Sequence, residues 1–460
     1  MDNKLKLTFY GGVGAVTGAN FLLESPQTRL LVDCGLLQGT EEAGTENSAN
    51  FQYDPKTIDF LFITHAHMDH IGKIPKLVRD GFRGVIYSTP ETRDIATLMF
   101  ADALKVMLNN ARNNPDNAHL EPHLYEAKDV EQTNLLWKTI EYHVPTDIGT
   151  DLSVYLKDAG HILGSSMYEF TYNGKKIIFT GDSGNSPTPL LRDTESIEGV
   201  QYLVMDSVYG DRNHEPKDVR DARFKAIVTE TIAAVGALVI PAFSIERTQV
   251  ILFELDKLVE ENQIPSVPVF LDSPLGSHVT GIYERSVDDF NTEVQQEIKT
   301  GDDVFDFPKL NVTQNSFESR EIEHVKNPKI IIAGSGMSAG GRVIGHEMQY
   351  LPDPKSTILL MGYQAVGTLG RTIQDKPKEV EIEGQMIPVH ARIEMISGYS
   401  SHKDSDHLVE MAAQAKETLK KVFVVMGEPK SSLYLVQRLR DYAELDAIYP
   451  ERGKVYELEM

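Results

Sequence analysis

Residues 60–70 read FLFITHAHMDH, an apolar run that leads directly into four ionisable side chains. The run predicts a buried strand, and the side chains that follow it are His65, His67, Asp69 and His70. His65 and His67 are one residue apart, so both rings leave an extended segment on the same face. Imidazole and carboxylate are ligands that zinc prefers. Two ligand sets in one internal loop favour two neighbouring metals over a His-rich surface loop.

The composition limits the class of protein. The chain has 460 residues, of which 41% are hydrophobic, and this length favours two domains. No apolar run is long enough to cross a membrane, and the first residues lead into a strand-like run without a signal peptide. The single cysteine, Cys34, excludes an internal disulfide framework and predicts a reducing, cytoplasmic location.

The net charge bears on the binding partners. The formal charge is −23 at pH 7, which argues against non-specific adhesion to nucleic acid or to an anionic membrane. Nucleic acid can still bind at a local groove with a metal cluster at its base. Short acidic pairs such as Glu260-Glu261 are expected on solvated faces.

Two further candidate ligands lie among glycines after predicted strands. His161 follows a strand at residues 153–157, and Asp182 follows a hairpin at residues 167–180 whose turn is Asn-Gly. A lone histidine is more often packed, and a lone aspartate more often a turn residue. Asp33 ends another predicted strand, where it can brace the metal loop through a hydrogen bond or serve as a turn residue.

The remaining elements of the first 210 residues alternate between strands and helices. We expect strands at residues 5–10, 20–24, 29–33, 85–89 and 202–205. We expect helices at residues 71–79, 91–112 and 128–139, with Trp137 on a packed face of the last one. The glycines at residues 11–14 lack the GK[ST] ending of a P-loop and predict a tight turn.

The pattern changes after residue 210. Near-continuous apolar strands at residues 237–240, 267–271, 330–333 and 357–361 alternate with helices, which is typical of a parallel sheet covered by helices. We expect an inserted domain at residues 211–390 between two parts of a first domain, residues 1–210 and 391–460. A strand from residue 391, helices, and a strand at residues 422–426 are expected to complete the first domain.

Small polar loops follow the strands of the insert. Ligands of open α/β sheets bind at the carboxyl ends of strands, where helix N-termini offer free N–H groups to anions. The candidate substrate-binding residues at these loops are Ser244, Arg247, Ser335, Gly336 and Arg342. The arginines, together with Arg371, can bind phosphate oxygens through two hydrogen bonds or form intramolecular salt bridges.

The H-x-H-x-D-H loop and the ligands after it resemble the metallo-β-lactamase superfamily. Six more stretches resemble its β-CASP branch: DSVYGDR at 206–212, PAFS at 241–244, DSP at 272–274, GSGM at 334–337 with GGR at 340–342, GYQ at 362–364 with GTL at 367–369, and SSHKD at 400–404. This branch contains the endonuclease subunit of the cleavage and polyadenylation specificity factor, its bacterial and archaeal homologues, RNase J and Artemis. The stretch at 362–369 is most similar to the cleavage-factor type.

The resemblance implies an α/β fold, namely an αββα sandwich with ligands on loops along one edge and an inserted β-CASP domain. It implies metal ligation by six residues, with Asp182 as the bridging ligand: His65, His67, Asp69, His70, His161 and Asp182. It also implies that His402 protonates the leaving oxygen and that Asp206 orients His402. The family's next motif residue, usually a histidine, is Met426 here. Because a thioether is a poor zinc ligand, we expect two zinc ions with a weak second site.

The implied function is that of a zinc-dependent ribonuclease. The metals would activate a water as hydroxide for attack on an RNA phosphodiester, with Asp69 holding the nucleophile and His402 donating a proton. Single-stranded RNA is the expected partner, and a homodimer is left open. The alternatives are a DNA nuclease, favoured by Met426, and a non-catalytic RNA-binding subunit with a degenerate second metal site. A small-ester or lactone hydrolase is the fourth hypothesis, but such an enzyme would not need a phosphate-binding insert.

Overall fold

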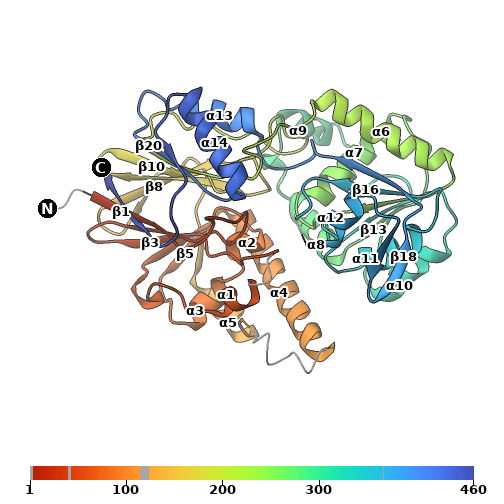
Figure 1. Cartoon of the computed structure of the whole chain (residues 1–460), viewed down its shortest axis with the longest axis horizontal. Helices are drawn as coiled ribbons and strands as arrows, with labels where there is room; N and C mark the ends of the chain where they lie inside the picture. The colour runs from red at the N-terminus through yellow and green to blue at the C-terminus, as the bar shows by residue number, and fades with distance from the viewer. Residues whose placement is uncertain (1–3, 40–42, 114–123, 366) are drawn as a thin grey trace. The chain divides into compact units, whose positions relative to one another are not determined.

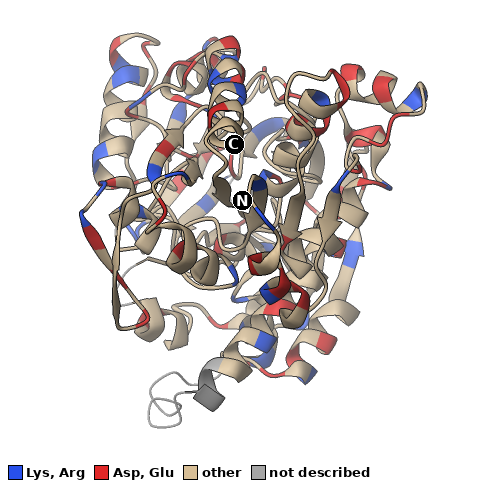
Figure 2. Cartoon of the chain, turned by 90° about the vertical axis from the view of Figure 1, so that its right-hand side faces the viewer, with Lys and Arg blue, Asp and Glu red and all other residues tan. Residues whose placement is uncertain are grey.

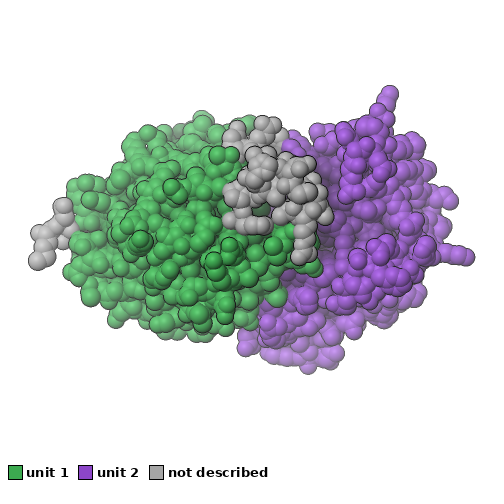
Figure 3. Space-filling model, turned by 90° about the horizontal axis from the view of Figure 1, so that it is seen from below, with its two compact units in different colours: residues 1–188, 192–213, 402–460 green, residues 189–191, 214–401 purple. Residues whose placement is uncertain are grey.

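A computed structural model describes residues 4–39, 43–113, 124–365 and 367–460, and the chain forms two compact units (Figures 1 and 3). Unit 1 contains residues 1–188, 192–213 and 402–460. Unit 2 contains residues 189–191 and 214–401. The chain therefore leaves unit 1, builds unit 2 and returns to complete unit 1.

Unit 1 is built on two seven-stranded sheets. The first has the order β22-β1-β2-β3-β4-β5-β6, with bounds Val455–Glu459, Lys4–Phe9, Phe21–Glu24, Arg29–Val32, Phe60–Phe62, Val85–Ser88 and Trp137–Thr139. The second has the order β21-β20-β11-β10-β9-β8-β7, with bounds Ala447–Ile448, Lys421–Val424, Tyr202–Met205, Lys175–Phe179, Ser166–Tyr172, Leu152–Asp158 and Thr146–Ile148.

The two sheets pack face to face around an aromatic core. Phe62 of β4 and Phe170 of β9 lie with ring centroids 5.0 Å apart, and both are fully buried. Side chains of β8 alternate between buried and half-buried, as expected for a strand whose two faces meet different layers. Burial of such large aromatic side chains is a main source of stability for a domain of this size.

Helices cover the outer faces of the sandwich (Figure 1). Leu408 and Leu435 bring α13 and α14 into an apolar cluster with the second sheet, while α4 and α5 lie with the first. The helices of unit 1, with one 3₁₀ turn, are α1 Ala43–Ser48, η1 Pro55–Thr57, α2 Met68–Ile71, α3 Ile74–Arg79, α4 Pro90–Asn113, α5 Ala127–Leu136, α13 Ser405–Ala413 and α14 Pro429–Asp441. Unit 1 is thus an αββα sandwich, as the resemblance implies.

Unit 2 contains a six-stranded parallel sheet in the order β14-β13-β15-β12-β16-β19. The strands are Leu310–Val312, Val269–Asp272, Lys329–Ala333, Ala237–Pro241, Thr357–Met361 and Arg392–Ile396. Strands β12, β13, β15 and β16 are buried along their whole length, which explains their near-continuous apolar sequences. A small hairpin adds β17 Glu379–Ile382 and β18 Gln385–Pro388.

The helices of unit 2 flank this sheet and follow its strands. With two 3₁₀ turns they are α6 Lys217–Ala233, α7 Arg247–Glu260, α8 Pro274–Tyr283, η2 Val287–Asp289, α9 Thr292–Lys299, α10 Ser316–Glu321, η3 Ile322–His324, α11 Val343–Tyr350 and α12 Leu369–Gln374. Acidic and basic residues are interspersed over the elements that Figure 2 shows. No helix in the described part of the chain is long and apolar enough to cross a membrane.

Two sequence-based predictions of the fold are wrong. The helix expected at residues 128–139 ends at Leu136, and Trp137 begins β6, which pairs with β5; the Trp137 indole donates a hydrogen bond to Ser88 Oγ at 2.9 Å. Residues 392–396 do not return to the sandwich, because β19 pairs with β16 in unit 2. The insert therefore extends to residue 401 rather than to 390.

Candidate metal centre

Three loops and one short helix of unit 1 bring the predicted ligands together. His65 comes shortly after β4, and His67 precedes α2, which carries Asp69 and His70. His161 lies in the loop between β8 and β9, and Asp182 follows β10. Because adjacent strands end at the same edge of the sandwich, side chains that are more than 100 residues apart in the sequence meet there.

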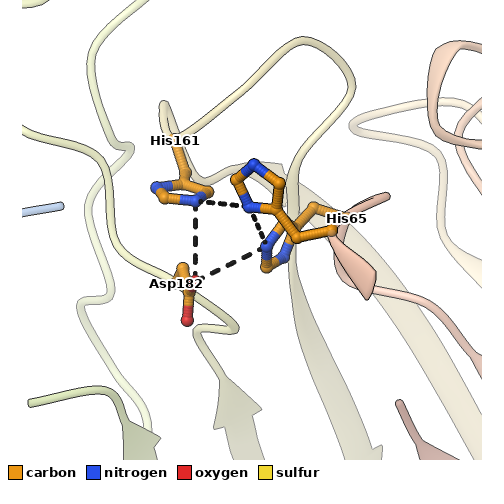
Figure 4. A group of neighbouring side chains, drawn as sticks. His65, His161 and Asp182 are labelled. Carbon is orange, nitrogen blue, oxygen red and sulfur yellow. Dashed lines mark hydrogen bonds and ion pairs between the residues drawn. The ribbon is translucent and has the colours of Figure 1, made fainter. Parts of the chain in front are cut away.

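The first ligand set contains His65, His67, His161 and Asp182, whose ligand atoms all lie within 4.8 Å of one another. The Nε2 atoms of His65 and His161 each lie 3.5 Å from Asp182 Oδ2 (Figure 4). His67 Nδ1 lies 3.0 Å from His65 Nε2 and 3.3 Å from His161 Nε2. The three rings and the carboxylate therefore converge on one point.

These separations fit a tetrahedral metal site. For metal–ligand bonds of about 2.0–2.1 Å, the four ligand atoms of a tetrahedron lie about 3.3 Å apart. The observed distances of 3.0–3.5 Å bracket that value. The donor set, three imidazoles and a carboxylate, is also one that zinc accepts. The residues of the first set thus fit a divalent cation in both spacing and chemistry.

The second set contains Asp69, His70 and Asp182. His70 Nε2 lies 3.4 Å from Asp182 Oδ1 and 3.8 Å from Asp69 Oδ2. Both His70 Nε2 and Asp182 Oδ1 are buried, and neither forms a hydrogen bond with any residue that the structure describes. Buried polar atoms without such a partner are costly, and a shared cation would satisfy both. Asp182 thus presents one oxygen to each set, as a bridging ligand must.

Asp33 supports the second set through a contact with the His70 ring. Its Oδ2 lies 2.7 Å from His70 Nδ1, so Nε2 of that ring faces the other ligands. Thr64 fixes Asp33 in turn, because its backbone N–H and its hydroxyl each donate a hydrogen bond of 2.8 Å to the carboxylate. A metal-bound histidine commonly makes such a contact with its second nitrogen. The sequence did not single out Thr64, although a hydroxyl directly before the first histidine was a visible signal.

Electrostatics distinguish the ligands. Burial, then His70, lowers the pKa of His65 well below its usual value, which leaves the ring neutral and able to bind a metal. Burial disfavours the charged form of Asp182, but His70 more than offsets it and holds the pKa of the carboxyl well below its usual range. Burial raises the pKa of Asp69 to about 6. Because metal ligands must be deprotonated, metal binding here competes with protons in acid.

His402 and Asp206 lie beside the first set. His402 is held by a bridge between its backbone and Gly184, and its ring centroid is 4.6 Å from that of His161. Nδ1 of His402 lies 3.9 Å from both Asp206 Oδ2 and Asp182 Oδ2. The Ser183 N–H donates to Asp206 Oδ1 at 3.0 Å. Burial lowers the pKa of His402, but Asp206 and Asp182 outweigh it and raise the value.

Met426 takes part in packing. It is 1% exposed and belongs to the apolar core between the two sheets, which includes Phe21 and Phe179. Its sulfur lies 2.6 Å from the position that a Cβ atom on Gly12 would occupy, so the glycine leaves room for this side chain. Met426 thus fills space in the core, where the resemblance leads one to expect a histidine ligand.

The predicted substrate-binding residues lie in unit 2, at the carboxyl ends of its strands. Ser244 Oγ is 3.4 Å from Ser273 Oγ, and the Gly336 carbonyl accepts a hydrogen bond of 3.1 Å from Gln364. Ser335 Oγ accepts one from the Ala339 N–H at 2.9 Å. Arg247 begins α7 and lies near Gly362.

Arg342 differs from the other candidates. Its Nη1 lies 2.7 Å from Oδ1 of the buried Asp272 and 2.9 Å from Thr313 Oγ1. Asp272 also lies 2.7 Å from His346 Nε2. Arg342 therefore forms an intramolecular salt bridge, and its role in binding phosphate stays a prediction.

Comparison with protein families gives three matches along the chain. The Metallo-beta-lactamase superfamily model matches residues 13–235, the Beta-Casp domain matches residues 248–373, and the Zn-dependent metallo-hydrolase RNA specificity domain matches residues 386–450. The first match contains both ligand sets, and the third contains His402. The family implies binding of a divalent metal.

Individual proteins are similar over nearly the whole chain. Ribonuclease TTHA0252 of Thermus thermophilus is 33% identical, over 94% of this chain and 95% of the relative. Transcription termination factor FttA is 30% identical in Methanosarcina mazei and 32% in Thermococcus kodakarensis, in each case over 94% of this chain and 68% of the relative. This chain also superposes on the crystal structure of an Enterococcus faecalis V583 protein of unknown function, with a TM-score of 0.58 and 14% identity over 99% of this chain and 100% of that one. At this low identity the likeness shows the fold alone.

Proposed function

Because the chain belongs to the β-CASP branch of the metallo-β-lactamase superfamily, we propose that it is a zinc-dependent ribonuclease that cleaves single-stranded RNA in the cytoplasm. The observation that carries the proposal is the pair of ligand sets that share Asp182, with His402 and Asp206 beside them. A metal-dependent hydrolase needs the metal ligands, and cleavage of a phosphodiester also needs a proton donor for the leaving oxygen.

Two zinc ions are the proposed cofactors. His65, His67, His161 and Asp182 would hold one, and Asp69, His70 and Asp182 the other. When bound, such ions supply Lewis acidity to a phosphoryl oxygen and to an attacking water. With Met426 in the core, the second set has three ligands among the residues that the structure describes, so we expect it to bind its ion more weakly than the first.

His402 and Asp69 handle the protons of the reaction. The water releases a proton to the solvent as its oxygen forms a bond to phosphorus, and the bond from phosphorus to the 3′ oxygen breaks. His402, whose pKa is raised above its usual value, gives its proton to that oxygen. Asp206 is a positioning residue that holds the His402 ring, and Asp69, at the edge of the site, holds the attacking water by hydrogen bonding.

RNA is favoured over DNA by the comparisons. The matched domain at residues 386–450 is named for RNA specificity, and the relative from Thermus thermophilus is a ribonuclease. Ser244, Arg247, Ser335 and Gly336 are the residues we propose to contact backbone phosphates, through hydroxyl, guanidinium and backbone N–H groups. Met426 is the one feature that favours DNA.

The test is cleavage of labelled single-stranded RNA and DNA of the same sequence by the zinc-loaded protein. We expect cleavage of RNA, and a loss of about 10²–10⁴-fold in His402→Ala with the zinc content unchanged. His324→Ala, which replaces an exposed histidine of unit 2, is the matched control. Cleavage of DNA in preference to RNA would assign the DNA alternative, and no cleavage of either would contradict nuclease activity.

A further inference from the structure

A second group of potential metal ligands lies in unit 2 and is made of carboxylates alone. Asp256 and Glu260 lie four residues apart on α7, hence on one face of the helix. Asp302 lies in the loop that follows α9. One carboxylate oxygen from each of the three lies within 4.8 Å of the other two. Like charges so close together are repulsive unless a proton or a cation intervenes.

Asp256 is the buried member of this group. It is 1% exposed, and no residue in the described part of the chain donates a hydrogen bond to its buried Oδ1 atom. An unsatisfied carboxylate oxygen in the interior is costly. Because one carboxylate oxygen of Asp256 lies within 4.8 Å of oxygens of Glu260 and Asp302, the buried side chain points into the cluster.

The surroundings of Asp256 are also acidic. Glu297, on α9, has a buried Oε2 atom without a hydrogen bond among the described residues, and the nearby Lys257 ammonium lies 3.2 Å from its other oxygen. Burial, followed by Asp302 and Glu260, raises the pKa of Asp256 to about 8. The acidic groups around Asp256 thus repel one another and favour the binding of a proton or a cation.

We propose that Asp256, Glu260 and Asp302 bind a hard divalent cation, Ca²⁺ or Mg²⁺, at a site separate from the metal centre of unit 1. Such cations take oxygen ligands and complete their coordination with water, whereas zinc prefers sites with nitrogen or sulfur. The bound cation connects α7 to the loop after α9 and stabilises unit 2. This site is independent of the proposed nuclease chemistry.

The direct test is cation content. The zinc-loaded full chain is dialysed against Ca²⁺ or, separately, Mg²⁺, and the bound cation is measured by mass spectrometry. We expect about one equivalent that is lost in Asp256→Asn and bound at least tenfold more weakly in Glu260→Gln. Glu381→Gln, which alters an exposed carboxylate of β17, is the matched control and should bind normally.

Thermal unfolding gives a second measurement. Ca²⁺ or Mg²⁺ should raise the unfolding midpoint of the wild type and of Glu381→Gln by a few degrees, because a ligand that binds only the folded state stabilises it. It should not do so for Asp256→Asn, and the zinc content of all variants should be equal. The proposal is overturned if the wild type binds neither cation at millimolar concentration, or if Asp256→Asn and Glu260→Gln both retain full binding.

Discussion

Two groups of ligand-type side chains in the described residues, one around Asp182 in unit 1 and one around Asp256 in unit 2, differ in what surrounds the central acid. In unit 1, Asp182 lies 3.4–3.5 Å from imidazole nitrogens of His65, His70 and His161, and its pKa is held low. In unit 2, Asp256 faces other carboxylates, and its pKa is raised to about 8. Both acids are buried. Burial raises the pKa of both carboxyl groups, and the neighbouring histidines reverse the shift at Asp182, whereas the neighbouring carboxylates add to it at Asp256.

The same difference separates the two kinds of chemistry. A mixed set of imidazoles and carboxylate suits zinc and its Lewis acidity, and an all-oxygen set suits a structural cation.

The largest effect is expected for Asp182→Asn. The amide keeps the shape of the side chain but removes the charge that both ligand sets share, so zinc content should fall. RNA cleavage should drop by about 10³-fold or more, because residues that act together lose most of their effect when one of them is removed. Asp147→Asn, an exposed change on β7, should leave both unchanged. Full zinc content and activity in Asp182→Asn would show that Asp182 does not bridge two metal ions.

Asp33→Asn should have a smaller effect. The change weakens the contact of 2.7 Å with His70 Nδ1 without removing a ligand, and loss of such a supporting group typically costs about 10–100-fold in metal affinity. Competition with a zinc chelator measures the change. We expect the more weakly bound zinc to be affected most, because Asp33 contacts His70 of the second set directly and is linked to His65 of the first set through Thr64. An equal loss of affinity for both zinc ions would show that Asp33 does not act mainly on the second set.

Stepwise removal of metal tests directly whether the two ligand sets bind zinc with different affinities. A chelator added slowly to the wild type should release one zinc well before the other, because the second set has three protein ligands and the first has four. Activity should disappear with the first ion released. Simultaneous release of both ions would mean that Met426 does not weaken the second set.

The smallest effect concerns Glu347 in unit 2, a buried acid whose pKa is raised by burial to about 7. The folded state keeps this proton up to about pH 7, whereas the unfolded chain loses it near the ordinary value of 4.5. The stabilisation is therefore complete below pH 4.5 and is lost as the pH rises to 7. Glu347→Gln should lose less stability than the wild type between pH 5 and 7.5.

Urea unfolding at the two pH values measures this difference, which cannot exceed about 1.4 kcal/mol per pH unit for one proton. The exposed change Glu381→Gln should follow the wild type. Parallel pH profiles for the wild type and Glu347→Gln would show that the buried carboxyl has an ordinary pKa.

The sequence predicts the metal centre better than it predicts the boundaries of the fold. The ligands are polar residues directly after apolar strands, and strand ends meet at one edge of a sandwich, so their convergence follows from local signals. Residues 392–396 show the limit, since their apolar pattern predicts a strand but not its partner β16. Trp137 is similar, because pairing with β5 overrides a helical pattern.

The acidic cluster of unit 2 could not be predicted from the sequence. Asp256 and Glu260 appear as polar positions of an amphipathic helix, and such runs are usually solvated. Only tertiary packing buries Asp256 and brings the loop of Asp302 to it. The sequence likewise does not predict the salt bridge of Arg342, whose partner Asp272 is 70 positions away.

The measurement that tests the central claim most directly is zinc content determined alongside RNA cleavage, for the wild type and for His402→Ala. We predict about two zinc ions in both proteins, cleavage of single-stranded RNA by the wild type, and a loss of at least 10²-fold in the variant. Wild-type protein that holds two zinc ions and cleaves RNA no faster than His402→Ala would contradict the proposed role of His402 as the proton donor.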